Sequence, residues 1–142
     1  MLMASLGELQ AEISAGHEAL REAIAGAGDV WEQTPAEGAE GEESWSPRQA
    51  AEHVIGAMTF FATGIATATG QDTPERPELS LATPDDALPA LAAAIEVSDR
   101  VFGALSDEDM SKEVGRGGSV ESLLEIAGGH GANHAQQIQD AS

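Results

Sequence analysis

Apolar residues recur at alternating three- and four-residue steps in four stretches of the chain, the pattern of helices that bury one face. The first stretch shows it through Leu2, Leu6, Leu9, Ile13, Leu20 and Ile24. The four stretches predict helices over about 3–28, 47–69, 84–105 and 119–140, and none of the remaining sequence reads as a strand. The sequence therefore predicts an all-α fold: a single domain over residues 1–142, built as an up-down-up-down four-helix bundle.

Two of these helices have well-marked first residues. Ser46 is a suitable N-cap, Pro47 suits the first helical position, and Gln49 completes a capping box. Thr83 precedes a proline and two acids in the same way, but Pro89 lies deep for a first turn. The third helix is therefore expected either to be kinked or to start later than residue 84.

The charge balance narrows the classes of partner. The chain has 25 acidic residues against 6 basic ones, a formal net charge of −19. Nucleic-acid phosphates and anionic membrane surfaces both need Lys and Arg, so neither is an expected partner. The sequence contains no cysteine, no apolar run long enough to span a bilayer and no basic segment resembling a signal peptide. A soluble cytoplasmic protein is expected, and a small-molecule substrate is compatible with this composition.

Three histidines are the main candidates for chemistry. His130 and His134 stand four residues apart, so they lie on one face of the fourth helix, and that face is the apolar stripe. His53 lies on the stripe side of the second helix, which would run parallel to the fourth at a similar height in an up-down bundle. Three neutral imidazoles would leave one to three coordination positions open, as in catalytic metal sites.

The residues alone leave other interpretations open. A pair of histidines at this spacing also occurs by chance, and His17 is expected to be an ordinary core or surface histidine that could at most line the pocket. Gly131 stands where zinc proteases carry their general base, and Glu52 projects about 100° away from its neighbour His53 around the helix. Any chemistry would therefore have to come from water or substrate bound to the metal.

Glycines surround the histidine pair on the fourth helix. Gly128, Gly129 and Gly131 each cost about 0.8–1 kcal/mol relative to alanine within a helix. Two explanations fit: a close crossing with another helix, or space left above a metal for a substrate.

Two short motifs resemble those of the DinB-like superfamily, which includes proteins described as metal-dependent hydrolases of the YfiT type. The segment from Trp45 through Ser46 to His53 is similar to the family's W-S start of the second helix. The segment His130-x-x-x-His134 followed by Gln137-Ile138 is similar to its closing H-x-x-x-H-x-x-Q-I. Their order and separation match, so the resemblance extends over nearly the whole chain.

The resemblance implies a DinB bundle in which His53, His130 and His134 hold one divalent ion: zinc, nickel, iron or manganese. Relatives in the family include thiol transferases that use bacillithiol, mycothiol or glutathione, and a mycothiol-dependent maleylpyruvate isomerase. A low-molecular-weight thiol is therefore a candidate cofactor. Of the few basic residues, Arg48 and Arg116 are the ones expected near the mouth of the pocket. The candidates to line the pocket are His17, Arg48, Gln49, Gly131 and Gln137.

Two hypotheses of function follow. In the first, the protein is a metal-dependent transferase or hydrolase that activates a thiol or water at the three-histidine site. In the second, it is a non-catalytic bundle whose histidines bind a structural metal or none, and which acts through dimerisation or small-molecule binding. A homodimer is compatible with either hypothesis.

Overall fold

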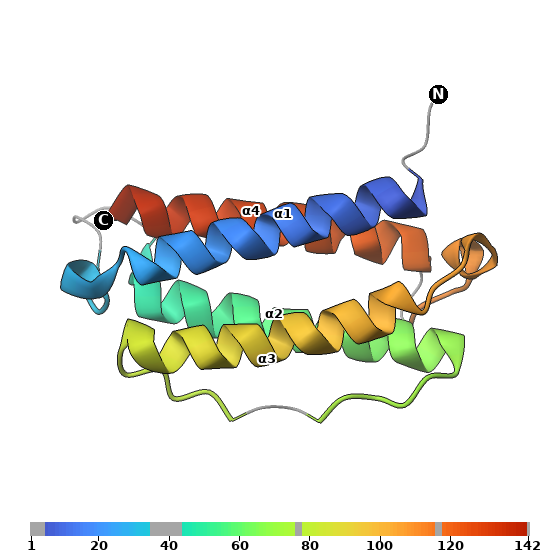
Figure 1. Cartoon of the computed structure of the whole chain (residues 1–142), viewed down its shortest axis with the longest axis horizontal. Helices are drawn as coiled ribbons and strands as arrows, with labels where there is room; N and C mark the ends of the chain where they lie inside the picture. Colours follow the sequence, from blue (N-terminus) through green and yellow to red (C-terminus); the bar gives the residue numbers. More distant parts are fainter. Residues whose placement is uncertain (1–4, 35–43, 76–77, 116–117, 142) are drawn as a thin grey trace.

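The computed structural model describes residues 5–34, 44–75, 78–115 and 118–141. Over these ranges the chain is helical, without strands beyond one isolated bridge between Glu113 and Ser119. The elements are α1 (Leu6–Ala25), η1 (Gly28–Val30), α2 (Pro47–Thr69), α3 (Pro84–Gly103), η3 (Asp107–Ser111) and α4 (Val120–Ala141). The predicted all-α fold with four main helices is confirmed (Figure 1).

Side-chain caps fix the starts of all four main helices, and at α4 the Ser119 hydroxyl accepts a hydrogen bond from the Ser122 N–H at 3.1 Å. At α2 the Ser46 hydroxyl accepts a hydrogen bond from the Gln49 N–H, and Gln49 Oε1 accepts from the Ser46 N–H at 2.9 Å. Ser5 caps α1 and Thr83 caps α3 by the same kind of bond. The α2 helix ends at Gly70, whose φ of 74° is the left-handed conformation that glycine adopts without strain.

The end of the first helix differs from the prediction, and the start of the third helix decides between the two alternatives left open by the sequence. The first helix ends at Ala25 rather than at residue 28, because the Ala27 N–H bonds to the Ile24 carbonyl only three residues back and Gly28–Val30 then form the separate short helix η1. The third helix begins at Pro84 and continues through Pro89, so the later start considered from the sequence is wrong.

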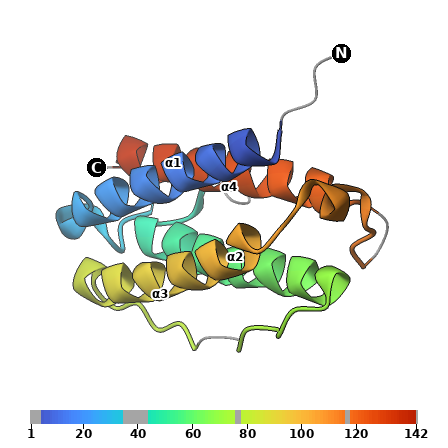
Figure 2. The ribbon, with the colours of Figure 1, turned by 45° about the vertical axis from the view of Figure 1, so that its right-hand side comes forward.

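Helices α2 and α3 run in the same direction. Near their starts, the Leu81 N–H donates to Glu52 Oε2 at 3.2 Å, and near their ends Gln71 Nε2 donates to the Val101 carbonyl at 3.0 Å. Figures 1 and 2 show the two helices side by side, with the chain between them returning along the bundle.

Helix α4 runs against α2 and along α1. His53 on α2 lies beside His130 on α4, while Gly64, further along α2, lies against Leu123, earlier on α4. Glu12 of α1 lies against Gly128 of α4, and Gly16, one turn later on α1, lies against Ala132, one turn later on α4, so α1 and α4 are parallel. The order is therefore up-down-down-up, and the predicted up-down-up-down order is wrong.

The connection between α2 and α3 makes this order possible. A helix of 23 residues is about 34 Å long, and the 14 residues from 70 to 83 can span roughly 46 Å when extended. That reach is enough to carry the chain back to the end where α2 began. A short loop would instead have forced α3 to run antiparallel to α2.

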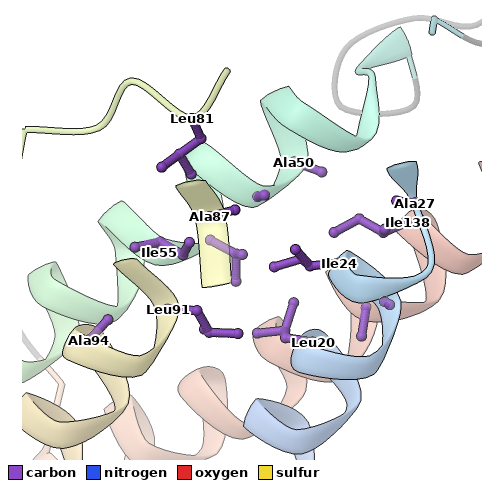
Figure 3. Packing of buried hydrophobic residues seen from close by; sticks show 14 of the residues in the cluster. Leu20, Ile24, Ala27, Ala50, Ile55, Leu81, Ala87, Leu91, Ala94 and Ile138 are labelled. Carbon is purple, nitrogen blue, oxygen red and sulfur yellow. The ribbon is translucent and has the colours of Figure 1, made fainter. Parts of the chain in front are cut away.

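The core consists of two apolar clusters, one towards each end of the bundle. Figure 3 shows one of them, where Leu20, Ile24, Ile55, Leu91 and Ile138 from the four helices point towards one another. The other is built around Leu9, Ile13, Phe61, Ile65, Val101, Phe102, Val120 and Leu124. Buried polar side chains lie between the clusters along the helices: His17 on α1, Ser98 on α3 and His134 on α4. The bundle therefore has a polar middle between two apolar ends.

Candidate metal centre

The structure brings His53, His130 and His134 together. His130 Nε2 lies 3.1 Å from His53 Nε2 and 3.2 Å from His134 Nε2. One ring nitrogen from each of the three lies within 4.8 Å of the others, a group that could hold a metal ion. His134 is buried at 4% exposure, and the other two are half-buried.

These histidines meet although the direction of α4 relative to α2 was predicted wrongly. His130 lies ten residues after α4 begins and eleven before it ends, so it is near the midpoint of the helix. The height of a midpoint residue in the bundle is nearly the same whichever way the helix runs. His134 follows one turn later on the same face.

Gln137 orients the most buried of the three imidazoles. Its Oε1 lies 2.8 Å from His134 Nδ1, and because an amide oxygen only accepts hydrogen bonds, Nδ1 carries the proton. His134 Nε2 then keeps its lone pair and directs it towards His130. A hydrogen bond of this kind on the far side of a ring is typical of metal-bound histidine.

The nitrogens are arranged for a cation more readily than for hydrogen bonds. Two nitrogens bound about 2.0–2.1 Å from one zinc ion at a tetrahedral angle would lie about 3.3 Å apart, close to the two short separations here. His130 Nε2 has two nitrogen neighbours at hydrogen-bonding distance, but a neutral ring nitrogen offers either one proton or one lone pair. A single ion accepts all three lone pairs at once.

Trp45 lies against two of the imidazoles. Its ring is stacked with His134 at 6.2 Å between centroids and 14° between planes, and it is tilted against His53 at 4.9 Å. Trp45 directly precedes the N-cap Ser46, so the capping box that starts α2 also places this ring. Phe61 meets His130 edge-on at 5.6 Å from another side.

An inner cavity adjoins the site. His17, Ser98, His130 and Gly131 line it together with apolar side chains, and its roughly 10 Å³ would hold about one water molecule. His17 is 7% exposed, and its Nδ1 has no hydrogen-bond partner among the described residues. Burial lowers the pKa of His17, while the charge of Asp99 opposes this shift.

An outer groove of about 630 Å³ opens onto the site from the surface. Two of the imidazoles, His53 and His130, line it. The other lining residues come from α2 and from the segment before α3: Glu52, Gly56, Ala57, Phe60, Phe61 and Leu79. His134, behind these two rings and against Trp45, does not line the groove. The groove therefore gives a molecule in solution a path to two of the three imidazoles.

The structure places the predicted pocket residues in different surroundings. Gln137 contacts a site histidine directly, while His17 and Gly131 line the inner cavity. Arg48 lies near the groove without lining it, and Gln49 is held in the capping box and does not line either space. Arg116 lies outside the described residues.

Arg48 is already paired with carboxylates. Its Nη1 donates to Glu32 Oε1 at 2.6 Å, and its Nε lies 3.6 Å from Glu52 Oε2. The hydrogen bond to Glu32 raises the pKa of the Arg48 guanidinium. Glu52 is occupied by Arg48 and the Leu81 N–H, consistent with its expected direction away from the histidines.

Several residues around the site were not found from the sequence. The sequence indicated Trp45 only as part of the motif at the start of the second helix, although its position eight residues before His53 could have indicated a wall of the site. Phe60 gave a clearer signal, because adjacent phenylalanines on one helix cannot both face the core. Leu79 carried no signal, since its position depends on the path of the segment before α3.

The family model of the DinB superfamily matches residues 12–138. No curated protein and no solved structure matches the chain. Within the described ranges, none of the helices is both long and apolar enough to cross a membrane.

Proposed function

Because the chain belongs to the DinB superfamily, we propose that His53, His130 and His134 bind one divalent transition metal, and that the protein is a metal-dependent transferase or hydrolase. The observation that carries this proposal is the cluster of one ring nitrogen from each of the three histidines within 4.8 Å of one another, with Gln137 holding the His134 ring in the ligating tautomer. The all-nitrogen donor set favours zinc, nickel or iron over manganese, which prefers oxygen ligands.

The protein's own residues bind and orient in this proposal. Three histidine ligands leave coordination positions open, and the outer groove leads to two of the three rings. When bound, the metal would lower the pKa of a thiol or a water molecule so that it attacks as the anion. Trp45 and Phe61 cover other sides of the imidazoles and restrict access by bulk water.

The alternative of a non-catalytic bundle is supported by one observation. Glu52 is the titratable residue of the groove apart from the histidines, and it is held by Arg48 and the Leu81 N–H. The one carboxylate among the described groove residues is therefore already engaged, through its Oε2 atom, in an ion pair and a hydrogen bond. Turnover would then depend chiefly on the metal. If there is no turnover, the three-histidine site would stabilise the fold or bind a small molecule. The single domain, the cytoplasmic location and the homodimer expected from the sequence stay predictions.

Elemental analysis of untagged protein tests the metal site. We expect about one equivalent of a transition metal in the wild type and none in a His130→Ala, His134→Ala double variant. His17→Gln is the matched control, because it removes a buried histidine outside the cluster, and it should keep the metal. Absence of metal from wild-type protein reconstituted with zinc, nickel or iron would overturn the proposal.

A screen with thiols and esters then separates the two functions. Metal-dependent turnover that is lost in the double variant, while its helical circular dichroism is unchanged, would support the enzyme. A metal that raises the unfolding temperature without turnover of any tested substrate would favour the non-catalytic bundle.

A further inference from the structure

The residues that line the outer groove favour some classes of ligand over others. Apart from the two histidines, one charged residue lines it, Glu52, and the rest of the lining is glycine or apolar. Phe60 is 71% exposed, an unusual state for a phenylalanine, and it lies on the groove beside the site. Leu79 also lines the groove, against Gly56, which is one turn before Phe60 on α2. An aromatic or branched apolar group would be covered between these side chains.

The electrostatics of the groove disfavour anions. None of the basic residues that the structure describes lines it, and Arg48, beside it, is paired with Glu32 and Glu52. The chain carries a net charge of −19, so its long-range field slows and weakens the association of negatively charged molecules. A bound divalent ion would add two positive charges at the imidazoles, but the walls of the groove would still offer a ligand's carboxylates no basic partner among the described residues.

We propose that the outer groove receives a small uncharged molecule that carries an aromatic or branched apolar group, and that it discriminates against ligands with carboxylates. This inference rests on the proposed metal site, because the groove leads to it. It gives Phe60 a role in specificity: its exposed ring supplies apolar contact area next to the imidazoles. An anionic low-molecular-weight thiol would then be a poor ligand for this protein.

Two thiol probes test the inference on cobalt-loaded protein. Benzyl mercaptan is uncharged and aromatic, whereas mercaptosuccinate offers a thiol with two carboxylates. Binding of either one is followed by the absorption that arises when a thiolate joins cobalt, with the His130→Ala, His134→Ala protein as the blank. We expect benzyl mercaptan to bind at least tenfold more tightly. Equal or tighter binding of mercaptosuccinate would overturn the inference.

Cobalt content, measured separately, distinguishes the two proposals. Protein that fails to take up cobalt or any other transition metal contradicts the metal site and the inference that rests on it. Protein that takes up one equivalent of cobalt but does not prefer benzyl mercaptan contradicts the groove inference alone.

A charge-matched pair of variants locates the preference in the groove. Phe60→Lys replaces the exposed ring by a cation, and we expect the ratio of the two affinities to shift at least tenfold towards mercaptosuccinate. Ile126→Lys adds the same charge at an exposed apolar residue of α4 that does not line the groove, and it should change the ratio by less than twofold. Equal shifts in the two variants, or none in Phe60→Lys, would show that the groove does not set the preference.

Discussion

The two sides of α4 differ in composition and in what they contact. Towards α1 it presents Gly128 and Gly131, and a Cβ added at Gly16 of α1 would lie 3.4 Å from the Ala132 backbone nitrogen and 3.5 Å from the Gly128 carbonyl. Towards α2 it presents His130 and His134, whose rings meet His53. One side is a backbone-to-backbone contact, and the other is a cluster of imidazoles.

This difference explains the cost of the glycines near the histidines. Gly128 and Gly131 lie against α1, so they belong to a close helix crossing; they do not open space on the groove side, where a substrate would enter. The crossing allows α4 little freedom to slide or rotate, and His130 and His134 are thereby held at a fixed height opposite α2. The contact of α4 with α1 therefore positions the histidines that α4 presents towards α2.

Gly16→Leu should have the largest effect, because it disrupts the close contact between α1 and α4. The larger side chain would meet the α4 backbone, which cannot move without separating the helices. We expect a loss of about 3 kcal/mol in the free energy of unfolding, together with weaker metal binding. Urea unfolding followed by circular dichroism measures the first effect, and metal titration the second.

Gly7→Leu is the matched control for this variant. Gly7 is on the same helix but exposed, with nothing closer to an added Cβ than the Ser5 hydroxyl at 4.0 Å. It should leave stability unchanged or slightly raised, since leucine favours helix. If Gly16→Leu were as stable as Gly7→Leu, α1 and α4 would not be in close contact.

Gln137→Ala changes the α2 side without removing a ligand. The substitution deletes the acceptor that holds the His134 proton on Nδ1, so we expect metal affinity to fall by about 10- to 100-fold. Gln136→Ala removes the same side chain one residue earlier, where it is exposed and bonds Asp140, and it should leave metal affinity unchanged. Competition with a chromophoric chelator gives both affinities; a Gln137→Ala protein with wild-type affinity would mean that His134 needs no such support.

The helices were predictable because their signals are local. Ser46, Pro47 and Gln49 mark the start of α2 by hydrogen bonds within one turn, and the structure contains those bonds. The relative direction of α2 and α3 was not predictable in this way. It depends on whether residues 70–83 turn back at once or return along the bundle, and bonds between distant residues, such as Gln71 to Val101, hold the second arrangement.

The histidine cluster was predictable for a related reason. The four-residue spacing of His130 and His134 is local, and the midpoint position of His130 made its height insensitive to the wrong helix order. The walls of the groove were not predictable, because Leu79 reaches Gly56 only through the path of the connecting segment. Arg48 was expected at the mouth of the pocket. Its pairing with Glu32 was not predictable, because it depends on the residues after η1 lying beside the start of α2.

His17→Leu should stabilise the polar middle of the bundle by about 1–2 kcal/mol at pH 8, since it replaces a buried nitrogen without a partner by an apolar side chain. The pKa of His17 is lowered by burial, so below about pH 6.5 the unfolded chain binds a proton that the folded protein does not. The wild type therefore loses stability on acidification, and the advantage of the variant should grow from pH 8 to pH 5. Urea unfolding of both proteins across this range measures it; a constant or shrinking difference would show that His17 is protonated in the folded state.

Gly129→Ala should have the smallest effect, and it tests a position of α4 that contacts neither α1 nor the imidazoles. A Cβ at Gly129 would have nothing within 4 Å, because this residue faces neither α1 nor the imidazoles, whereas at Gly128 it would lie 3.1 Å from Glu12 Cδ. The change should therefore add close to the full alanine gain of about 0.8–1 kcal/mol and leave metal affinity unchanged. Gly128→Ala should gain less, since Glu12 has to move aside. Thermal unfolding of the two variants compares them, and equal gains would mean that the Glu12 side chain yields without cost. A loss of stability in Gly129→Ala would instead show that the glycine run is needed for the path of α4 itself, and not only for its contact with α1.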